Sequence, residues 1–178
     1  MSRRSAIALP LSRVRERAGV RAPDLALSLV DAASHADLPT RPTLRRWVLR
    51  ALERDARIAL VFVGTAAGRR LNRQFRGRDY ATNVLTFSYD DAAPGSAARK
   101  PVHADIILCL PVVRREAREQ GKRLRAHLAH LVIHGVLHAQ GYDHERDRDA
   151  RRMQARETRL LAGLRIADPY RADTAARA

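Results

Sequence analysis

Two short runs of consecutive apolar residues constrain the fold of this chain more than any other feature. They span residues 58–63 and 106–110, and each has the length of a β-strand. A strand that is apolar on both sides is typical of a sheet covered on both faces. Segments of helical length, with apolar residues three or four positions apart, lie between and after these runs. The pattern predicts an α/β (α+β) fold with three layers rather than a bundle of helices.

The length of the chain, 178 residues, favours a single domain, which we expect to occupy residues 24–165. Residues 1–23 contain six arginines and one acidic residue, and two prolines and a glycine interrupt any helix there. This predicts a basic, flexible N-terminal arm, although the composition also suits an organellar transit peptide. Residues 166–178 are expected to form a flexible C-terminal tail, and residues 90–101 have the composition of a loop between two strands.

Hydropathy and charge limit the location and the partners of the protein. No stretch approaches the roughly 18 apolar residues of a membrane-spanning helix, so we expect a cytoplasmic protein without membrane contacts. Cys109, the single cysteine, lies in an apolar run and is expected to be buried and reduced. The formal net charge of +15 favours a polyphosphate partner. However, 32 of the 34 basic residues are arginine, a bias that genome composition also produces, so charge alone does not identify the function.

The most informative segment, residues 127–144, holds five of the seven histidines. In a helix expected over residues 124–139, His134 and His138 lie on one face, about 6 Å apart along the axis. Gly141 suits the left-handed position that ends a helix, so the chain can fold back and bring His144 toward the same face. The spacing therefore predicts that His134, His138 and His144 share one metal ion.

Three neutral imidazoles with a fourth position left to water are typical of a catalytic zinc site, whereas structural sites close all four positions. We therefore predict one Zn²⁺ per chain, although a fourth ligand from elsewhere in the chain would close the site. A ligand set that uses His130 and His134 is also geometrically possible. It lacks the turn that brings in His144, and we rank it second.

The spacing HxxxHxxGxxH is also that of the metzincin proteases, whose motif begins HExxH. The chain has Gly135 where those enzymes carry the glutamate that acts as general base, so a metallopeptidase is disfavoured. Asp143 is the only nearby carboxylate that could replace this base. A more ordinary role for Asp143 is to hydrogen-bond to a metal-binding imidazole and orient it.

The segment HGVLHAQGYDH, residues 134–144, resembles the signature of the YbeY family of rRNA maturation endoribonucleases. Residues 71–87 resemble the family's block of a Leu-Asn pair, an arginine-glycine turn and a T(D/N)VLSF strand, and residues 105–108 resemble its GDI strand. The resemblance covers about residues 25–164. Three positions depart from the usual family pattern: Asn83, Thr86 and Ala104. Asn83 cannot act as a base, so we expect it only to hydrogen-bond in the wall of the cleft.

The resemblance implies a mixed four-stranded sheet flanked by about five helices, with the metal on the histidine-rich helix and the turn after it. It implies a single-strand-specific, zinc-dependent endoribonuclease in 16S rRNA 3′-end maturation and ribosome quality control. The implied partners are rRNA, the small ribosomal subunit and a ribosome-assembly GTPase. The implied metal ligands are again the three histidines of the motif. The resemblance implies a catalytic role for Arg76, which we group with His134 and His138. Apart from the resemblance, we expect Arg73 and Arg78 to bind RNA, and Asp143 and His130 to support the metal ligands.

Two other functions remain open at this point. The first is a ribosome-assembly module that binds RNA without cleaving it and whose zinc is structural. The second is the metallopeptidase, despite its missing glutamate. The residues also do not distinguish zinc from nickel as the native metal.

Overall fold

The structure is a computed structural model that describes residues 21–89, 100–144 and 146–170. Residues 1–20 of the expected arm and 90–99 of the expected loop lie outside these described residues. The described part contains four strands, five α-helices and one 3₁₀ turn: β1 Leu25–Val30, η1 Ala32–Ser34, α1 Arg41–Ala51, β2 Ala56–Val63, α2 Thr65–Arg76, β3 Val84–Ser88, β4 Val102–Cys109, α3 Leu110–Glu119, α4 Leu124–Ala139 and α5 Asp147–Ala162.

The four strands form one mixed sheet in the order β1-β2-β4-β3. β1 pairs with β2 and β2 with β4 in parallel, whereas β3 runs antiparallel to β4. The predicted mixed four-stranded sheet flanked by helices is therefore confirmed. β3 is an edge strand and α4 packs against both β3 and β4, so the residues at the end of β3 lie near the histidine-rich helix.

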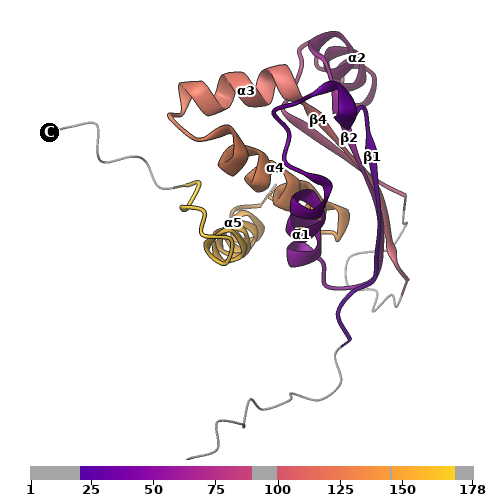
Figure 1. Cartoon of the computed structure of the whole chain (residues 1–178), viewed down its shortest axis with the longest axis vertical. Helices are drawn as coiled ribbons and strands as arrows, with labels where there is room; N and C mark the ends of the chain where they lie inside the picture. Colours follow the sequence, from indigo (N-terminus) through magenta and orange to yellow (C-terminus); the bar gives the residue numbers. More distant parts are fainter. Residues whose placement is uncertain (1–20, 90–99, 145, 171–178) are drawn as a thin grey trace, which may run out of the picture.

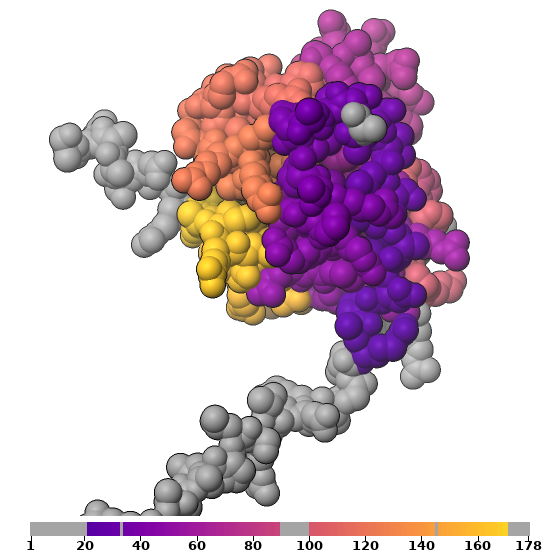
Figure 2. Space-filling model, viewed as in Figure 1, coloured from indigo at the N-terminus to yellow at the C-terminus, as the bar shows by residue number. Residues whose placement is uncertain are grey.

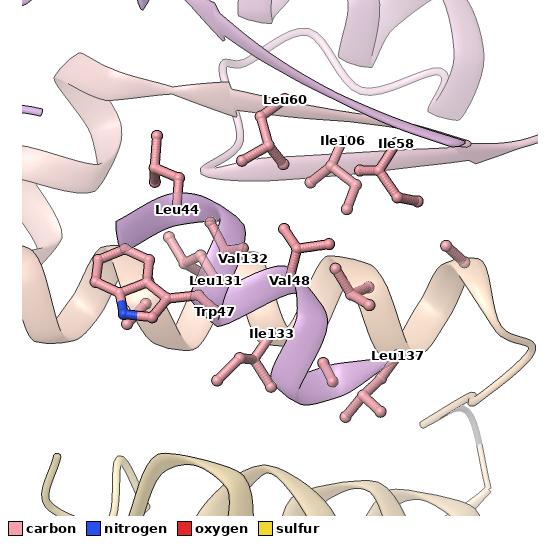
Figure 3. Packing of buried hydrophobic residues seen from close by; sticks show 14 of the residues in the cluster. Leu44, Trp47, Val48, Ile58, Leu60, Ile106, Leu131, Val132, Ile133 and Leu137 are labelled. Atoms are coloured by element: carbon pink, nitrogen blue, oxygen red, sulfur yellow. The ribbon is translucent and has the colours of Figure 1, made fainter. Parts of the chain in front are cut away.

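The hydrophobic core lies between one face of the sheet and the helices α1 and α4 (Figure 1). Figure 3 shows Ile58 and Leu60 of β2 and Ile106 of β4 directed toward Leu44 and Val48 of α1. All five side chains are at most 2% exposed. In Figure 2, the later helices, orange to yellow, lie against the N-terminal part of the described chain, in indigo and purple.

The opposite face of the sheet is covered only in part, by α2. The rings of Phe75 in α2 and Phe87 in β3 contact each other with centroids 4.7 Å apart. Along β2, alternate residues from Ile58 are buried, but those between them are only half-buried. The third layer is thus present, and it leaves the residues of β2 on this face half-buried.

The helix α4 is the central element, because it packs against α1, α3, α5, β3 and β4. Ten of the sixteen residues of α4 are buried. A helix that is buried on most sides carries apolar residues around most of its circumference, as α4 does. Its polar side chains include four histidines at positions 127, 130, 134 and 138. A rotation of 100° per residue places these four within a stripe about 80° wide. The packing of α4 therefore fixes where this stripe points.

The end of the chain folds back onto the domain after α5. Of the expected tail, the structure describes residues 166–170, and Ile166 packs against the core. Lys122 donates a hydrogen bond of 2.9 Å to the carbonyl oxygen of Pro169. Asp168 accepts hydrogen bonds from the Thr158 hydroxyl at 3.1 Å and from the backbone N–H of Tyr170 at 3.0 Å. These contacts place Tyr170 beside α4 and α5.

Candidate metal centre

Three histidine side chains meet at the C-terminal end of α4. The ring centroids of His134 and His138 are 4.5 Å apart, and those of His138 and His144 are 4.8 Å apart. One nitrogen from each of the three rings lies within 4.8 Å of the others. His134 and His138 are half-buried and His144 is exposed. Three nitrogens so close together suit a single ion with a side open to solvent.

The turn after α4 is what brings in the third ring. Gly141 has a φ of +88°, in the left-handed region. The N–H of Gly141 bonds to the carbonyl of His138 at 2.9 Å, and that of Tyr142 bonds to the carbonyl of Leu137 at 3.1 Å. This pair of bonds is a Schellman motif, which ends a helix and reverses the chain. The turn expected at Gly141 is therefore present.

The electrostatic environment favours the neutral form of His138. Burial, and then the neighbouring His134 and His144, lower the pKa of His138 from 6.5 to about 4. A histidine binds a metal through a neutral ring nitrogen, so protons do not compete for His138 at neutral pH. Asp143 acts on the centre from the turn, where its carboxylate accepts a 2.6 Å hydrogen bond from the backbone N–H of His144. One contact of Asp143 is thus with the backbone of a candidate ligand.

A buried carboxylate, that of Glu157 in α5, supports the histidines. Its side chain is 0% exposed. One oxygen is 2.7 Å from Nδ1 of His134, and the other is 3.2 Å from Nε2 of His130 and accepts a hydrogen bond from the Tyr170 hydroxyl. Burial by itself raises the pKa of Glu157, but the three hydrogen bonds outweigh it and lower the pKa to about 2. Glu157 is therefore ionised at neutral pH.

His130, His134 and Glu157 form a second group that could hold a metal ion. Both groups contain His134, but they line different cavities. His130, His134 and Glu157 line a neighbouring cavity of about 280 Å³ together with Leu131 and Met153. His130, which we expected to support the ligands, contacts Glu157 and stacks edge-on to His134 with centroids 6.1 Å apart.

The three histidines of the first group open into a cavity of about 310 Å³. Arg76 lines this cavity at the C-terminal end of α2, so the structure brings it together with the histidines. Arg73 and Arg78 are exposed beside the same helix end and do not line it. The rest of the lining is mostly hydroxyl and amide side chains from the strand β3 and the residues before it: Thr82, Asn83, Val84, Thr86 and Ser88.

Asn83 forms part of the wall of this cavity and is held on both sides of its amide. Its Nδ2 donates to the carboxylate of Glu116 at 3.0 and 3.3 Å, and its Oδ1 accepts the N–H of Val84 at 2.7 Å. Glu116 in turn lies 2.9 Å from Nε2 of His127. The amide therefore shapes the wall, as expected, and has no proton to exchange.

Gly135 marks the closest approach of α4 to the sheet. A Cβ atom at this position would lie 2.7 Å from Cγ2 of Ile106 and 3.1 Å from Oγ1 of Thr86. No side chain fits there, and one placed at this position would point into the sheet rather than into the cavity. The missing glutamate of the metzincin motif thus has a structural reason, and no described residue that lines the cavity carries a carboxylate.

Glu157 and Tyr170 were not among the residues predicted from the sequence. The sequence does contain one signal for Glu157, because it shares a helical stripe with Met153, Leu160 and Leu161. A carboxylate on the apolar face of a helix needs a buried partner. Tyr170 offered no such signal, because it lies eight residues beyond the end of α5.

The fold and the site define an α/β protein with a candidate three-histidine metal centre beside an arginine and an open cavity. A family model described as "Endoribonuclease YbeY" matches residues 33–165, and the chain belongs to this family. The resemblance seen in the sequence is therefore confirmed. In the described part of the chain, no helix combines the length and the apolar character that crossing a membrane requires.

Several curated relatives, each named Endoribonuclease YbeY, are more than 50% identical to the chain over the aligned residues. The relative from Aromatoleum aromaticum is 51% identical over 141 residues, which cover 79% of this chain and 87% of that protein. The relative from Herminiimonas arsenicoxydans is 57% identical over 135 residues, 75% of this chain and 86% of that protein. Among solved structures, the solution structure of TM1509 from Thermotoga maritima matches with a TM-score of 0.49 and 24% identity, and covers 83% of this chain and 99% of that one.

Proposed function

We propose that the protein is a zinc-dependent endoribonuclease that cleaves single-stranded RNA. The observation that carries this proposal is the shared cavity, in which Arg76 faces the three histidines His134, His138 and His144. The names of the relatives support the same activity. The basic character of the chain, with a formal net charge of +15, suits a polyanionic substrate.

The three histidines fit a zinc ion, because they offer three imidazole nitrogens within 4.8 Å of one another and an open side. A zinc ion held there would supply the positive charge that polarises a phosphate oxygen and lowers the pKa of a water molecule. The pKa of His138, lowered to about 4, keeps this ring in its metal-binding form. We expect one zinc ion per chain.

Arg76 would bind the scissile phosphate from the side of α2. A guanidinium group donates parallel hydrogen bonds to two phosphate oxygens and stabilises the charge that develops on them. Arg76 is exposed and has no acidic partner among the described residues, so its N–H donors are available to a ligand. Arg73 and Arg78 lie at the same helix end and would bind the RNA backbone on either side.

The composition of the cavity argues against peptide hydrolysis. Peptide hydrolysis in the HExxH enzymes uses a glutamate beside the metal as general base. The described lining of the cavity has hydroxyl and amide groups but no carboxylate, and Gly135 faces the sheet. A phosphodiester gains more from a cationic side chain than from such a base, because charge accumulates on its oxygens.

Within this activity, we propose the 3′ end of 16S rRNA as substrate and ribosome quality control as the wider role. The small ribosomal subunit and a ribosome-assembly GTPase would be the partners, in the cytoplasm. Mapping rRNA 3′ ends in small-subunit particles incubated with the protein tests this step. If protein that cleaves other single-stranded RNA leaves the 16S rRNA 3′ ends unprocessed, the proposed substrate is wrong and only the general RNA cleavage activity stands.

The activity itself is tested with a labelled single-stranded RNA, the same RNA as a duplex, and an unstructured peptide. We expect cleavage of the single strand only. Arg76→Ala should slow cleavage by about 100-fold or more, the usual loss for a group that stabilises developing charge. Arg57→Ala, which removes an exposed arginine from β2, is the matched control and should leave the rate unchanged. If Arg76→Ala and Arg57→Ala slow cleavage equally, Arg76 contributes only to the overall positive charge. Cleavage of the peptide would favour the metallopeptidase.

A further inference from the structure

Glu157 occupies a position where a carboxylate needs a specific reason to be. It lies on the apolar stripe of α5 with Met153, Leu160 and Leu161, and its side chain is 0% exposed. An isolated charge in such a place is strongly disfavoured. No lysine or arginine pairs with it among the described residues, and its partners are His130, His134 and Tyr170. Hydrogen bonds to these three groups therefore offset the free-energy cost of burying the carboxylate.

The bond to His134 determines which nitrogen of that ring remains for a metal. A carboxylate oxygen accepts hydrogen bonds, so the contact of 2.7 Å has the geometry in which Nδ1 of His134 donates its ring N–H to Glu157. Nε2 of a neutral ring then carries the lone pair. Nε2 is then the nitrogen of His134 that remains for a metal, while Nδ1 anchors the ring to α5.

We infer that Glu157 is a positioning residue for the metal centre, which holds His134 in the tautomer and ring orientation that three-histidine coordination requires. The inference rests on the metal site of the proposed function. Metal-binding histidines commonly donate their second ring N–H to a carboxylate, which orients the ring and makes it a stronger ligand. Here the carboxylate comes from a separate helix, so the packing of α5 on α4 enters directly into the geometry of the site.

The C-terminal segment takes part through Tyr170. Its hydroxyl donates to the carboxylate oxygen of Glu157 that does not contact His134. Asp168 holds the backbone N–H of Tyr170, and Pro169 is held by Lys122. Glu157 is thereby fixed at both oxygens, which restricts rotation of its carboxylate. The segment expected to be a tail thus contributes a side chain that keeps Glu157 aligned with His134.

Zinc affinity of the full-length protein, measured by competition with a chelator in the absence of RNA, tests the inference. Glu157→Gln keeps the shape of the side chain but removes its charge, and we expect a dissociation constant raised about 10- to 100-fold. Tyr170→Phe should raise it by a smaller factor. Glu116→Gln is the matched control, because Glu116 makes a similar contact of 2.9 Å to His127 on the same helix. It should bind zinc as the wild type does.

Nitrogen chemical shifts of His134 in the wild-type protein without metal provide a readout that requires no variant. We expect a protonated Nδ1 and an unprotonated Nε2. An unprotonated Nδ1, or Glu157→Gln binding zinc as tightly as wild type, would overturn the inference. Complete loss of binding in Glu157→Gln with full binding in His144→Gln would also overturn it, because Glu157 would then be a ligand itself. RNA cleavage enters none of these measurements, so failure of the proposed activity would be seen separately.

Discussion

His134 on α4 and Glu157 on α5 are joined by a contact of 2.7 Å between Nδ1 and the carboxylate. Through this contact the most buried charge near the site acts on a candidate ligand, and a residue 23 positions away along the chain sets its tautomer. The candidate metal centre is therefore built from three elements, namely α4, the turn at Gly141 and α5.

Loss of His144 separates the two groups of residues that could hold the metal. Because His144 belongs to the first group alone, His144→Gln should weaken zinc binding by more than the roughly 10- to 100-fold typical of an orienting partner. His130 belongs to the second group alone, so His130→Gln should keep one zinc per chain. Metal content after dialysis against buffered zinc measures both. The opposite ranking of the two variants would place the ion between His130, His134 and Glu157.

Removal of the metal should leave the fold intact. The buried side of α4 is held by apolar contacts with α1 and the sheet, whereas His134 and His138 are only half-buried and His144 lies in the turn after the helix. We expect the far-ultraviolet circular dichroism of the chelated protein to match that of the zinc-bound form at 25 °C. The melting temperature should fall only as expected from loss of a bound ligand. Unfolding on chelation would instead support a structural zinc and the assembly module.

Gly135→Ala should destabilise the protein although alanine favours helices. The added Cβ would meet Ile106 at 2.7 Å and Thr86 at 3.1 Å, so α4 or the sheet must move. Overpacking of this kind costs about 1–3 kcal/mol. Gly64→Ala is the control, because nothing lies within 4 Å of its Cβ. Equal free energies of unfolding for Gly135→Ala and the wild type in urea titrations would contradict the close approach of α4 to Ile106 and Thr86.

Part of this arrangement could be predicted from the sequence. The bounds of α4 agree with those expected, because Gly141 ends the helix in the left-handed conformation. The three-histidine group follows from spacing within one helix and one turn, which are local features. Arg76 was expected only from the family resemblance, since an arginine in a turn is ordinarily a solvated residue.

The remaining features arise from tertiary packing. Glu157 reaches His134 only because α5 packs on α4, and Tyr170 reaches Glu157 only because the chain folds back after α5. The run 58–63 was expected to be covered on both faces, but α2 extends over only part of the second face. An apolar run shows that a strand can be buried, and it does not show how far a neighbouring helix extends.

His127 should make the stability of the protein depend on pH. Its side chain is 4% exposed, and burial lowers its pKa below 6.5, an effect that the contact with Glu116 only partly offsets. The unfolded chain then binds the proton more readily than the folded one. The contribution of His127 to the free energy of unfolding is therefore fully present above pH 6.5. It decreases as the pH falls toward the pKa of His127 in the folded state.

Urea denaturation at pH 7.5 and 5.5 measures this effect. The wild type should lose more stability between the two values than His127→Gln does. His103→Gln, which changes an exposed histidine on β4, should behave as the wild type. An identical pH dependence in His127→Gln and wild type would contradict the assignment of a buried, neutral His127.

The most direct test of the account is the rate of single-stranded RNA cleavage as zinc is returned to metal-free protein. We expect the rate to rise with added zinc and to level off at about one zinc per chain, as a single three-histidine site requires. Arg76→Ala should bind the same zinc and remain slow. Cleavage that is equally fast without zinc, or a zinc-bound wild type that leaves the RNA intact, would contradict it.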